Sequence, residues 1–171
     1  FLALEGDRRR EVGWREAGER SDELAAGFLA VGVERGDRVA VASRTRLEWT
    51  LCEYALVSLG AVVVGHLEVQ RDDDEAVHVL AGSRCRMVVC EDAGVAERIG
   101  RLRPRLPDLE HLVVMEGAAA GATTLAELVR EGRARLDERP GEVAEAAARV
   151  SPDDVVAIIH NGPALFMPWA A

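Results

Sequence analysis

Residues 36–64 constrain the fold more than any other part of this chain, because their pattern changes twice within a short stretch. Val39, Val41 and the small residues beside them form a short apolar run, which is typical of a strand covered on both faces. Residues 44–59 carry apolar side chains at spacings of three and four, which predicts a helix, and Gly60 supplies the left-handed position that ends it. Residues 61–64 form a second apolar strand. Two buried strands joined by a helix make a right-handed βαβ unit, so we expect a parallel sheet.

The same alternation of helix and strand continues along the chain on both sides of this unit. We expect helices over residues 14–31, from Asp72 onward, over 93–102, from Thr124 to just before Gly132, and over 142–149. We expect strands over residues 86–90, 111–115 and 155–160. The pattern predicts an α/β fold, an open and mostly parallel sheet with helices on both faces.

Length, charge and hydropathy exclude several classes of protein. The 171 residues are enough for one domain with a sizeable core. The net charge of −9 argues against nucleic-acid binding, and the run Arg8–Arg10 is better interpreted as a solvated turn than as a basic patch. No apolar run approaches 18 residues, so we expect no transmembrane segment.

The cysteines and the acidic run could suggest metal sites, but their spacing favours simpler roles. Cys52, Cys85 and Cys90 include no C-x-x-C motif, and we expect Cys85 and Cys90 to lie on opposite faces of one strand. Reduced thiols in a cytoplasmic protein are the better interpretation. The run Asp72–Glu75 opens a helix, where acidic groups oppose the positive end of the dipole, whereas a metal site needs converging oxygens.

No catalytic, cofactor-binding or metal-binding residue is predicted. The four histidines stand alone near strand ends or on a helix, without a Cys or Ser partner at a usable spacing: His66, His78, His111 and His160. The segment Ser43-Arg44-Thr45-Arg46 follows a strand and opens a helix, where flavodoxin-like folds hold phosphate, but it lacks glycines. Helix capping by Ser43 and Thr45 is the favoured alternative. All 21 basic residues are arginine, so no lysine can hold a transferring phosphate.

Three segments of the central unit, Gly36–Ser43, Thr45–Trp49 and Leu59–Val64, resemble the N-terminal part of the AMP-forming acyl-CoA ligases. The sequence Arg46-Leu47-Glu48-Trp49 is most similar to the long-chain fatty acyl-CoA ligases, and the resemblance extends over residues 1–160. It implies a cytoplasmic enzyme, in some members peripheral to a membrane. It also implies that the full-length enzyme joins a fatty acid to coenzyme A with ATP and Mg²⁺.

The resemblance ends where the family continues into a loop rich in Gly, Ser and Thr that wraps the ATP phosphates and ends in Pro-Lys-Gly. Here residues 161–171 contain Pro163 and Pro168 and no lysine. We therefore expect an aberrant tail outside the family, produced by a frame slip after His160 or another interruption of the gene. A chain that opens on Phe1 is then an N-terminal fragment that binds no cofactor and is inactive alone, with exposed sheet edges that favour aggregation.

A second class of function fits the same alternation of elements. The chain could be a non-catalytic flavodoxin-like module that binds an anion or a protein partner, since a fold does not by itself give a function. This alternative predicts a monomer with one sharp thermal transition, whereas the fragment hypothesis predicts self-association.

Overall fold

The computed structural model describes residues 2–5, 8–65, 72–160 and 164–168. Its strands are β1 Leu2–Glu5, β2 Arg8–Glu11, β3 Arg38–Ala42, β4 Val62–Gly65, β5 Met87–Asp92, β6 His111–Glu116, β7 Thr123–Thr124, β8 Val155–His160 and β9 Ala164–Pro168. Its α-helices are α1 Trp14–Ala30, α2 Leu47–Ser58, α3 Asp73–Gly82, α4 Ala93–Leu102, α5 Leu125–Glu138 and α6 Glu142–Ala147. A short 3₁₀ turn, Arg103–Arg105, follows α4.

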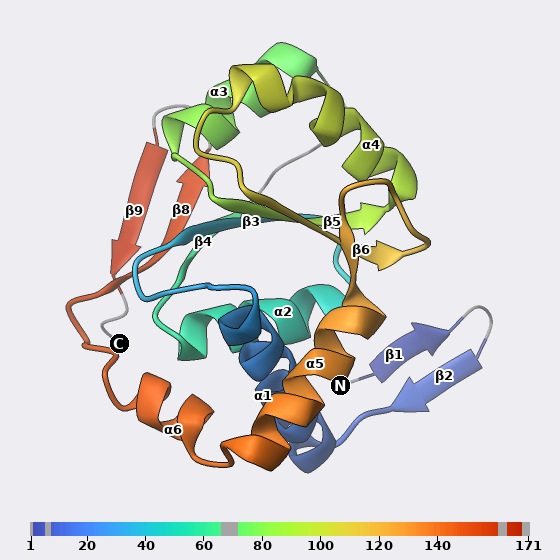
Figure 1. Cartoon of the computed structure of the whole chain (residues 1–171), viewed down its shortest axis with the longest axis vertical. Coiled ribbons are helices and arrows are strands. Elements are labelled where there is room, and N and C mark those ends of the chain that lie inside the picture. Colours follow the sequence, from blue (N-terminus) through green and yellow to red (C-terminus); the bar gives the residue numbers. More distant parts are fainter. Residues whose placement is uncertain (1, 6–7, 66–71, 161–163, 169–171) are drawn as a thin grey trace.

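Seven strands form one sheet in the order β7-β6-β5-β3-β4-β8-β9, and the first six of these run parallel. Helices α1, α2, α5 and α6 cover one face of this sheet, and α3 and α4 cover the other (Figure 1). Alternation along β3 divides the core, because Val39 and Val41 face the first layer while Ala40 and Ala42 face the second. The predicted α/β fold with an open parallel sheet is confirmed.

Helices α1 and α5 cross so closely that two glycines are required at the contact. A Cβ added to Gly132 would lie 1.9 Å from the backbone oxygen of Glu23, and one added to Gly27 would lie 2.4 Å from the backbone oxygen of Leu128. The prediction that the helix ends before Gly132 is wrong, because α5 continues to Glu138. Gly132 lies inside the helix since only a residue without a side chain fits against α1.

The sheet edge formed by β8 and β9 is less well covered than its centre. Strand β8 runs parallel to β4, and β9 pairs with β8 in the antiparallel direction. Of the six residues of β8 only Ile158 is buried, whereas all five positions from Met87 to Glu91 are buried in β5. Strand β9 lies within the segment expected to form a tail outside the family, so this segment adds a strand to the sheet edge.

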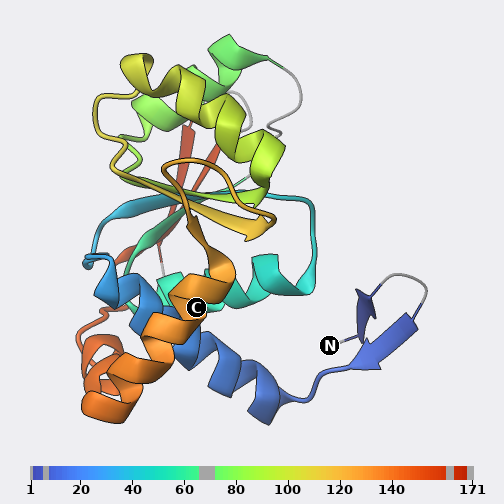
Figure 2. The ribbon, with the colours of Figure 1, turned by 45° about the vertical axis from the view of Figure 1, so that its right-hand side comes forward.

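The N-terminal hairpin was not predicted. Strand β2 pairs antiparallel with β1, so the prediction that Arg8–Arg10 forms a solvated turn is wrong. The hairpin projects from the body of the domain (Figure 2), and Arg10 pairs with Glu16 of α1. Two large hydrophobic residues of the predicted helices, Trp14 and Tyr54, are exposed, at 76% and 46%. Trp14 is the first residue of α1, and this end of the helix leads to the projecting hairpin (Figure 2).

Among the residues described, no helix combines the length and the hydrophobicity needed to cross a bilayer.

Candidate functional site

The carboxyl edge of the parallel sheet is the place where this fold could hold a ligand. From β3 the chain passes through α2 to β4 on one side, while β5 and β6 lie on the other side of β3. Open α/β sheets bind their ligands beyond the carboxyl ends of the strands at such a reversal, which in this chain lies between β3 and β5. The segment from Ser43 to Arg46 leaves β3 at this point, and Glu91 and Asp92 end β5.

Arg44 and Glu91 form an ion pair at this edge of the sheet. The Glu91 carboxylate accepts hydrogen bonds from the Arg44 backbone N–H at 2.9 Å, from Nε at 2.8 Å and from Nη2 at 2.5 Å. These bonds hold the pKa of Glu91 below its ordinary value. The Arg44 side chain is 80% exposed and the Glu91 side chain 10% exposed, so the carboxylate lies on the inner side of the pair.

Arg46, the second arginine of this segment, also has carboxylate partners. Its Nε lies 2.8 Å from Glu48 Oε2, and its Nη2 lies 2.6 Å from Glu116 Oε1 at the end of β6. An incoming phosphate would therefore have to displace carboxylates from both arginines, at a cost in charge-assisted hydrogen bonds. Both arginines of this segment are thus engaged by carboxylates in the described structure.

The predicted capping of α2 is wrong. The N-cap of α2 is Arg46, and its side chain makes no capping hydrogen bond. Ser43 Oγ instead donates to the carbonyl of Arg44 at 2.9 Å. The helix begins at Leu47, so Ser43 and Thr45 precede the turn whose free N–H groups they were expected to bind.

The structure gives His160 a serine partner that sequence spacing did not predict. His160 Nε2 and Ser83 Oγ lie 2.8 Å apart, and the His78 ring packs edge-on against His160 with centroids 6.3 Å apart. Burial, and then the neighbouring His78, lower the pKa of His160. Ser83 is only 7% exposed, which favours a structural hydrogen bond over a nucleophilic pair.

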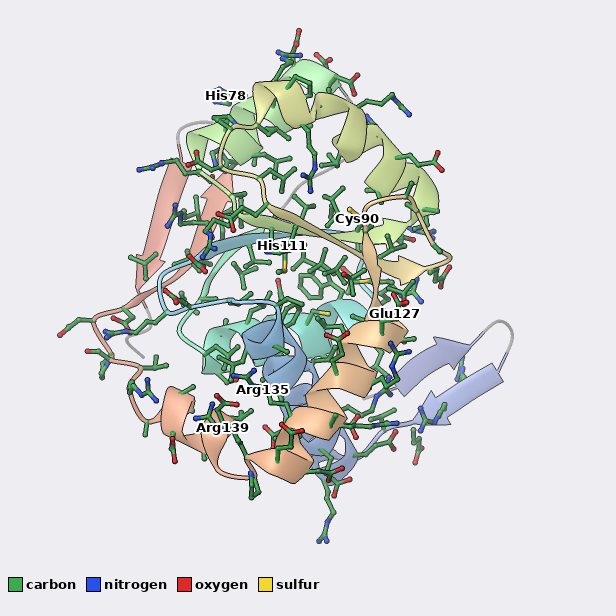
Figure 3. The ribbon with its side chains drawn as sticks, viewed as in Figure 1. His78, Cys90, His111, Glu127, Arg135 and Arg139 are labelled. Carbon is green, nitrogen blue, oxygen red and sulfur yellow. The ribbon has the colours of Figure 1, made fainter. Side chains whose placement is uncertain are left out.

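The other histidines are not brought together. His111 is at the start of β6, and its Nε2 lies 3.9 Å from Glu110 Oε2. Figure 3 shows His78 on the outer helix layer, far from His111. His66 lies outside the described residues. Of the four histidines, the structure therefore pairs only His78 and His160 within the part of the chain that it describes.

The three cysteines are buried and free. Burial raises the pKa of Cys52, Cys85 and Cys90 to about 12 each, so their thiols stay protonated near neutral pH. Cys85 and Cys90 do not lie on opposite faces as expected, since both belong to the core beneath α3 and α4. Cys85 precedes β5 and follows Arg84, whose φ is +54°, so strand alternation does not extend to it.

The acidic run at the start of α3 is explained by capping and ion pairs. The Asp72 side chain caps the helix by accepting from the Asp74 N–H at 3.1 Å. Asp73 pairs with Arg98 at 2.6 Å, and Asp74 pairs with Arg105 at 2.7 Å. Across the described ranges, no group of three or more His, Cys, Asp or Glu side chains could hold a metal ion.

Known proteins resemble this chain in both sequence and fold. The long-chain-fatty-acid–CoA ligase FadD15 of Mycobacterium tuberculosis is 29% identical over 151 residues, covering 88% of this chain and 24% of the relative. A second ligase of that organism, 3-[(3aS,4S,7aS)-7a-methyl-1,5-dioxo-octahydro-1H-inden-4-yl]propanoyl:CoA ligase, is 34% identical over 139 residues, covering 80% and 26%. The chain thus spans about a quarter of the length of these curated relatives.

A solved structure shows the same fold at lower identity. The inhibitor-bound N-terminal domain of FACL13 from Mycobacterium tuberculosis matches with a TM-score of 0.72 at 19% identity, over 95% of this chain and 38% of that one. The sequence model that describes the AMP-binding enzymes matches residues 2–161. Since that match takes in every parallel strand of the sheet, from β3 to β8, the chain belongs to the AMP-binding enzyme family.

Proposed function

We propose that residues 1–160 are the N-terminal part of the AMP-binding domain of a long-chain fatty acid–CoA ligase. Such an enzyme of cytoplasmic fatty acid metabolism would form an acyl-adenylate from ATP with Mg²⁺, and then pass the acyl group to coenzyme A. The name of FadD15 and the sequence Arg46-Leu47-Glu48-Trp49 support the long-chain assignment. The second mycobacterial ligase, with a polycyclic acid in its name, is the competing assignment.

We further propose that this chain is catalytically inactive alone. The main support is the carboxyl edge of the sheet, where Glu91, Glu48 and Glu116 already engage both arginines that could bind a phosphate. The sequence has no lysine, so the ammonium group that could neutralise a transferring phosphate is lacking as well. In this proposal the segment is a scaffold for a site built elsewhere in a longer enzyme.

The proposed domain boundary lies at residue 160, with residues 161–171 forming a tail outside the family. The family model ends at residue 161, which supports this division. The antiparallel direction of β9 is also consistent with it, since the other six strands of the large sheet run parallel to one another.

An ATP–pyrophosphate exchange assay tests inactivity directly. The purified chain is expected to give no exchange with palmitate, ATP and Mg²⁺, while full-length FadD15 assayed in parallel gives the positive signal. Palmitate-dependent exchange by the 171-residue chain would overturn the proposal.

A chimera tests the scaffold role and the acid class. Residues 1–160 replace the matching segment of FadD15, and the chimera is expected to keep palmitate-dependent exchange because its phosphate and acyl sites come from FadD15. A folded chimera that has lost exchange with every acid would contradict the scaffold assignment. The same segment is also grafted into the second mycobacterial ligase, and the exchange activity that each chimera retains is compared. Higher retained activity in the second ligase than in FadD15 would contradict the long-chain assignment.

One observation favours the alternative of a non-catalytic module. The strand order β4-β3-β5-β6-β7 is that of the flavodoxin-like folds, which exist as independent domains. The incomplete coverage of β8 instead supports our proposal that the isolated chain self-associates through this sheet edge. Light scattering and a thermal melt distinguish the module from the self-associating fragment. A monomer with a single sharp transition would favour the module.

A further inference from the structure

The ribbon formed by β8 and β9 has a narrow attachment to the sheet. It contacts the central strands through β4, with three residue pairs in register: Val63 with Ala157, Val64 with Ile158, and Gly65 with Ile159. Strand β9 pairs only with β8 in the large sheet. Elements with few buried contacts open locally at a lower free energy than the global transition. The hydrogen bond between His160 and Ser83 restrains the end of β8, so a second restraint is needed at its start.

Arg35 and Asp154 supply such a restraint. Arg35 lies in the turn before β3, and Asp154 directly precedes β8. Arg35 Nε donates to Asp154 Oδ2 at 2.8 Å, and Nη2 donates to Oδ1 at 2.5 Å, across 119 positions of sequence. The carboxylate also accepts from the Ser151 N–H at 2.9 Å. A bidentate pair fixes direction as well as distance, which a single contact does not.

The path of the Arg35 side chain is set by Gly60. A Cβ added to Gly60 would lie 2.9 Å from Arg35 Cγ, so the arginine stem passes directly over this glycine. Gly60 has a φ of +73° at the end of α2, and its carbonyl accepts from the Gly36 N–H at 2.8 Å. The pair also lines an open surface pocket of ≈ 560 Å³ at the amino ends of β4 and β8.

We propose that Arg35 and Asp154, here called the anchor pair, hold the start of β8 in register against β4. When the anchor pair is broken, the β8–β9 ribbon opens as a unit while the central sheet stays folded. The anchor pair is therefore a positioning pair with an effect confined to one end of the sheet. This inference concerns the folded chain itself and does not depend on the proposed ligase reaction.

Amide hydrogen exchange, followed by NMR on the full 171-residue chain at pH 7, tests the inference. Asp154→Asn keeps an oxygen for the Ser151 N–H but removes the charge that Arg35 binds. We expect the amides of residues 157–159 to exchange about fivefold to tenfold faster. This acceleration lies between the effect of losing an exposed ion pair and the effect of losing a hydrogen bond to a charged group. Amides of Val39–Val41 and Val88–Cys90 should keep their rates.

Two further variants make the test specific. Arg35→Gln is an exposed change that should accelerate the same amides, and the double variant should match either single variant because the two groups act together. Glu23→Gln is the matched control, since it removes an equally bidentate pair with Arg133 between α1 and α5, at 2.8 and 3.0 Å. It should leave β8 unchanged.

Two outcomes would overturn the inference. One is unchanged exchange in β8 for both Asp154→Asn and Arg35→Gln, which would make the pair incidental. The other is an equal acceleration in β3, β5 and β8, which would mean that the pair contributes only to global stability.

Discussion

The centre of the sheet and its β8–β9 edge have similar sequences but different surroundings. Strand β5 reads Met-Val-Val-Cys-Glu-Asp and its first five residues are buried, while β8 reads Val-Val-Ala-Ile-Ile-His and only Ile158 is buried. The difference comes from the helices, because β5 lies between the layer of α1, α2 and α5 and the layer of α3 and α4 (Figure 1). An apolar strand sequence therefore shows that a strand can be covered, and the tertiary structure decides whether it is.

The two regions are also held by different forces. The centre depends on close packing, of which the α1–α5 crossing at Gly27 and Gly132 is the tightest example. The edge depends on backbone pairing with β4, on the anchor pair at the start of β8, and on the hydrogen bond between His160 at the end of β8 and Ser83. We therefore expect substitutions in the centre to change global stability, and substitutions at the edge to change mainly local opening.

The largest effect is expected at the helix crossing in the central region. Gly132→Ala would place a methyl group 1.9 Å from the Glu23 carbonyl oxygen, so the helices must separate, which should lower the free energy of unfolding by about 2–3 kcal/mol. Urea denaturation measures the change. Gly18→Ala is the matched control in α1, where no atom lies within 4 Å of the added methyl group and helix propensity should raise stability by up to about 1 kcal/mol. A Gly132→Ala variant that gains stability would contradict the close crossing.

A pair of valine substitutions compares the two regions directly. Val88→Ala in β5 removes a fully buried side chain and should cost about 2 kcal/mol, whereas Val156→Ala in half-buried β8 should cost less than about 1 kcal/mol. Both values come from the same denaturation experiment. Equal costs would show that the edge is covered as well as the centre, and would remove the basis of the comparison.

The smallest effect is expected from a half-buried carboxyl group on α2, the helix that covers the central strands. Burial raises the pKa of Glu53 to about 7, above its ordinary value of 4.5. The folded state therefore favours the protonated form, and the associated stability is present below pH 4.5 and lost as the pH rises through about 7.

Glu53→Gln should remove this pH dependence. At pH 8 the variant should be more stable than the parent chain by about 1 kcal/mol, a value reduced from the full linkage because the group is partly exposed to solvent. At pH 4 the two chains should unfold at the same temperature. The same difference in melting temperature between variant and parent at pH 4 and at pH 8 would contradict the burial of Glu53.

The sequence predicted the features that depend on neighbouring residues. The strand–helix–strand unit of residues 36–64, the left-handed Gly60 and the helix over 93–102 are all confirmed. The helix expected from Thr124 begins there, and Thr124 caps α5 in a capping box with Glu127. Each of these features is determined within a few residues of chain, so local pattern is sufficient.

The errors occurred where distant segments meet. Gly132 indicated a helix end because glycine weakens helices, but its contact with Glu23 is 109 positions away in sequence and no local pattern reveals it. The contact between Ser83 and His160 likewise joins residues far apart. At the candidate site the sequence marked Arg44 and Arg46 as possible anion ligands, and only the structure showed that Glu91 and Glu116 already bind them.

By itself, the sequence determined the class of fold and the family, because periodic apolar residues and a few turn glycines fix the order of strands and helices. The tertiary structure alone decided which faces are covered and which charges are neutralised. Burial and ion pairing depend on the positions of several elements at once, so they are properties of the assembled sheet and its two helix layers. For that reason the carboxyl edge, a ligand site by topology, is in this chain a surface of paired charges.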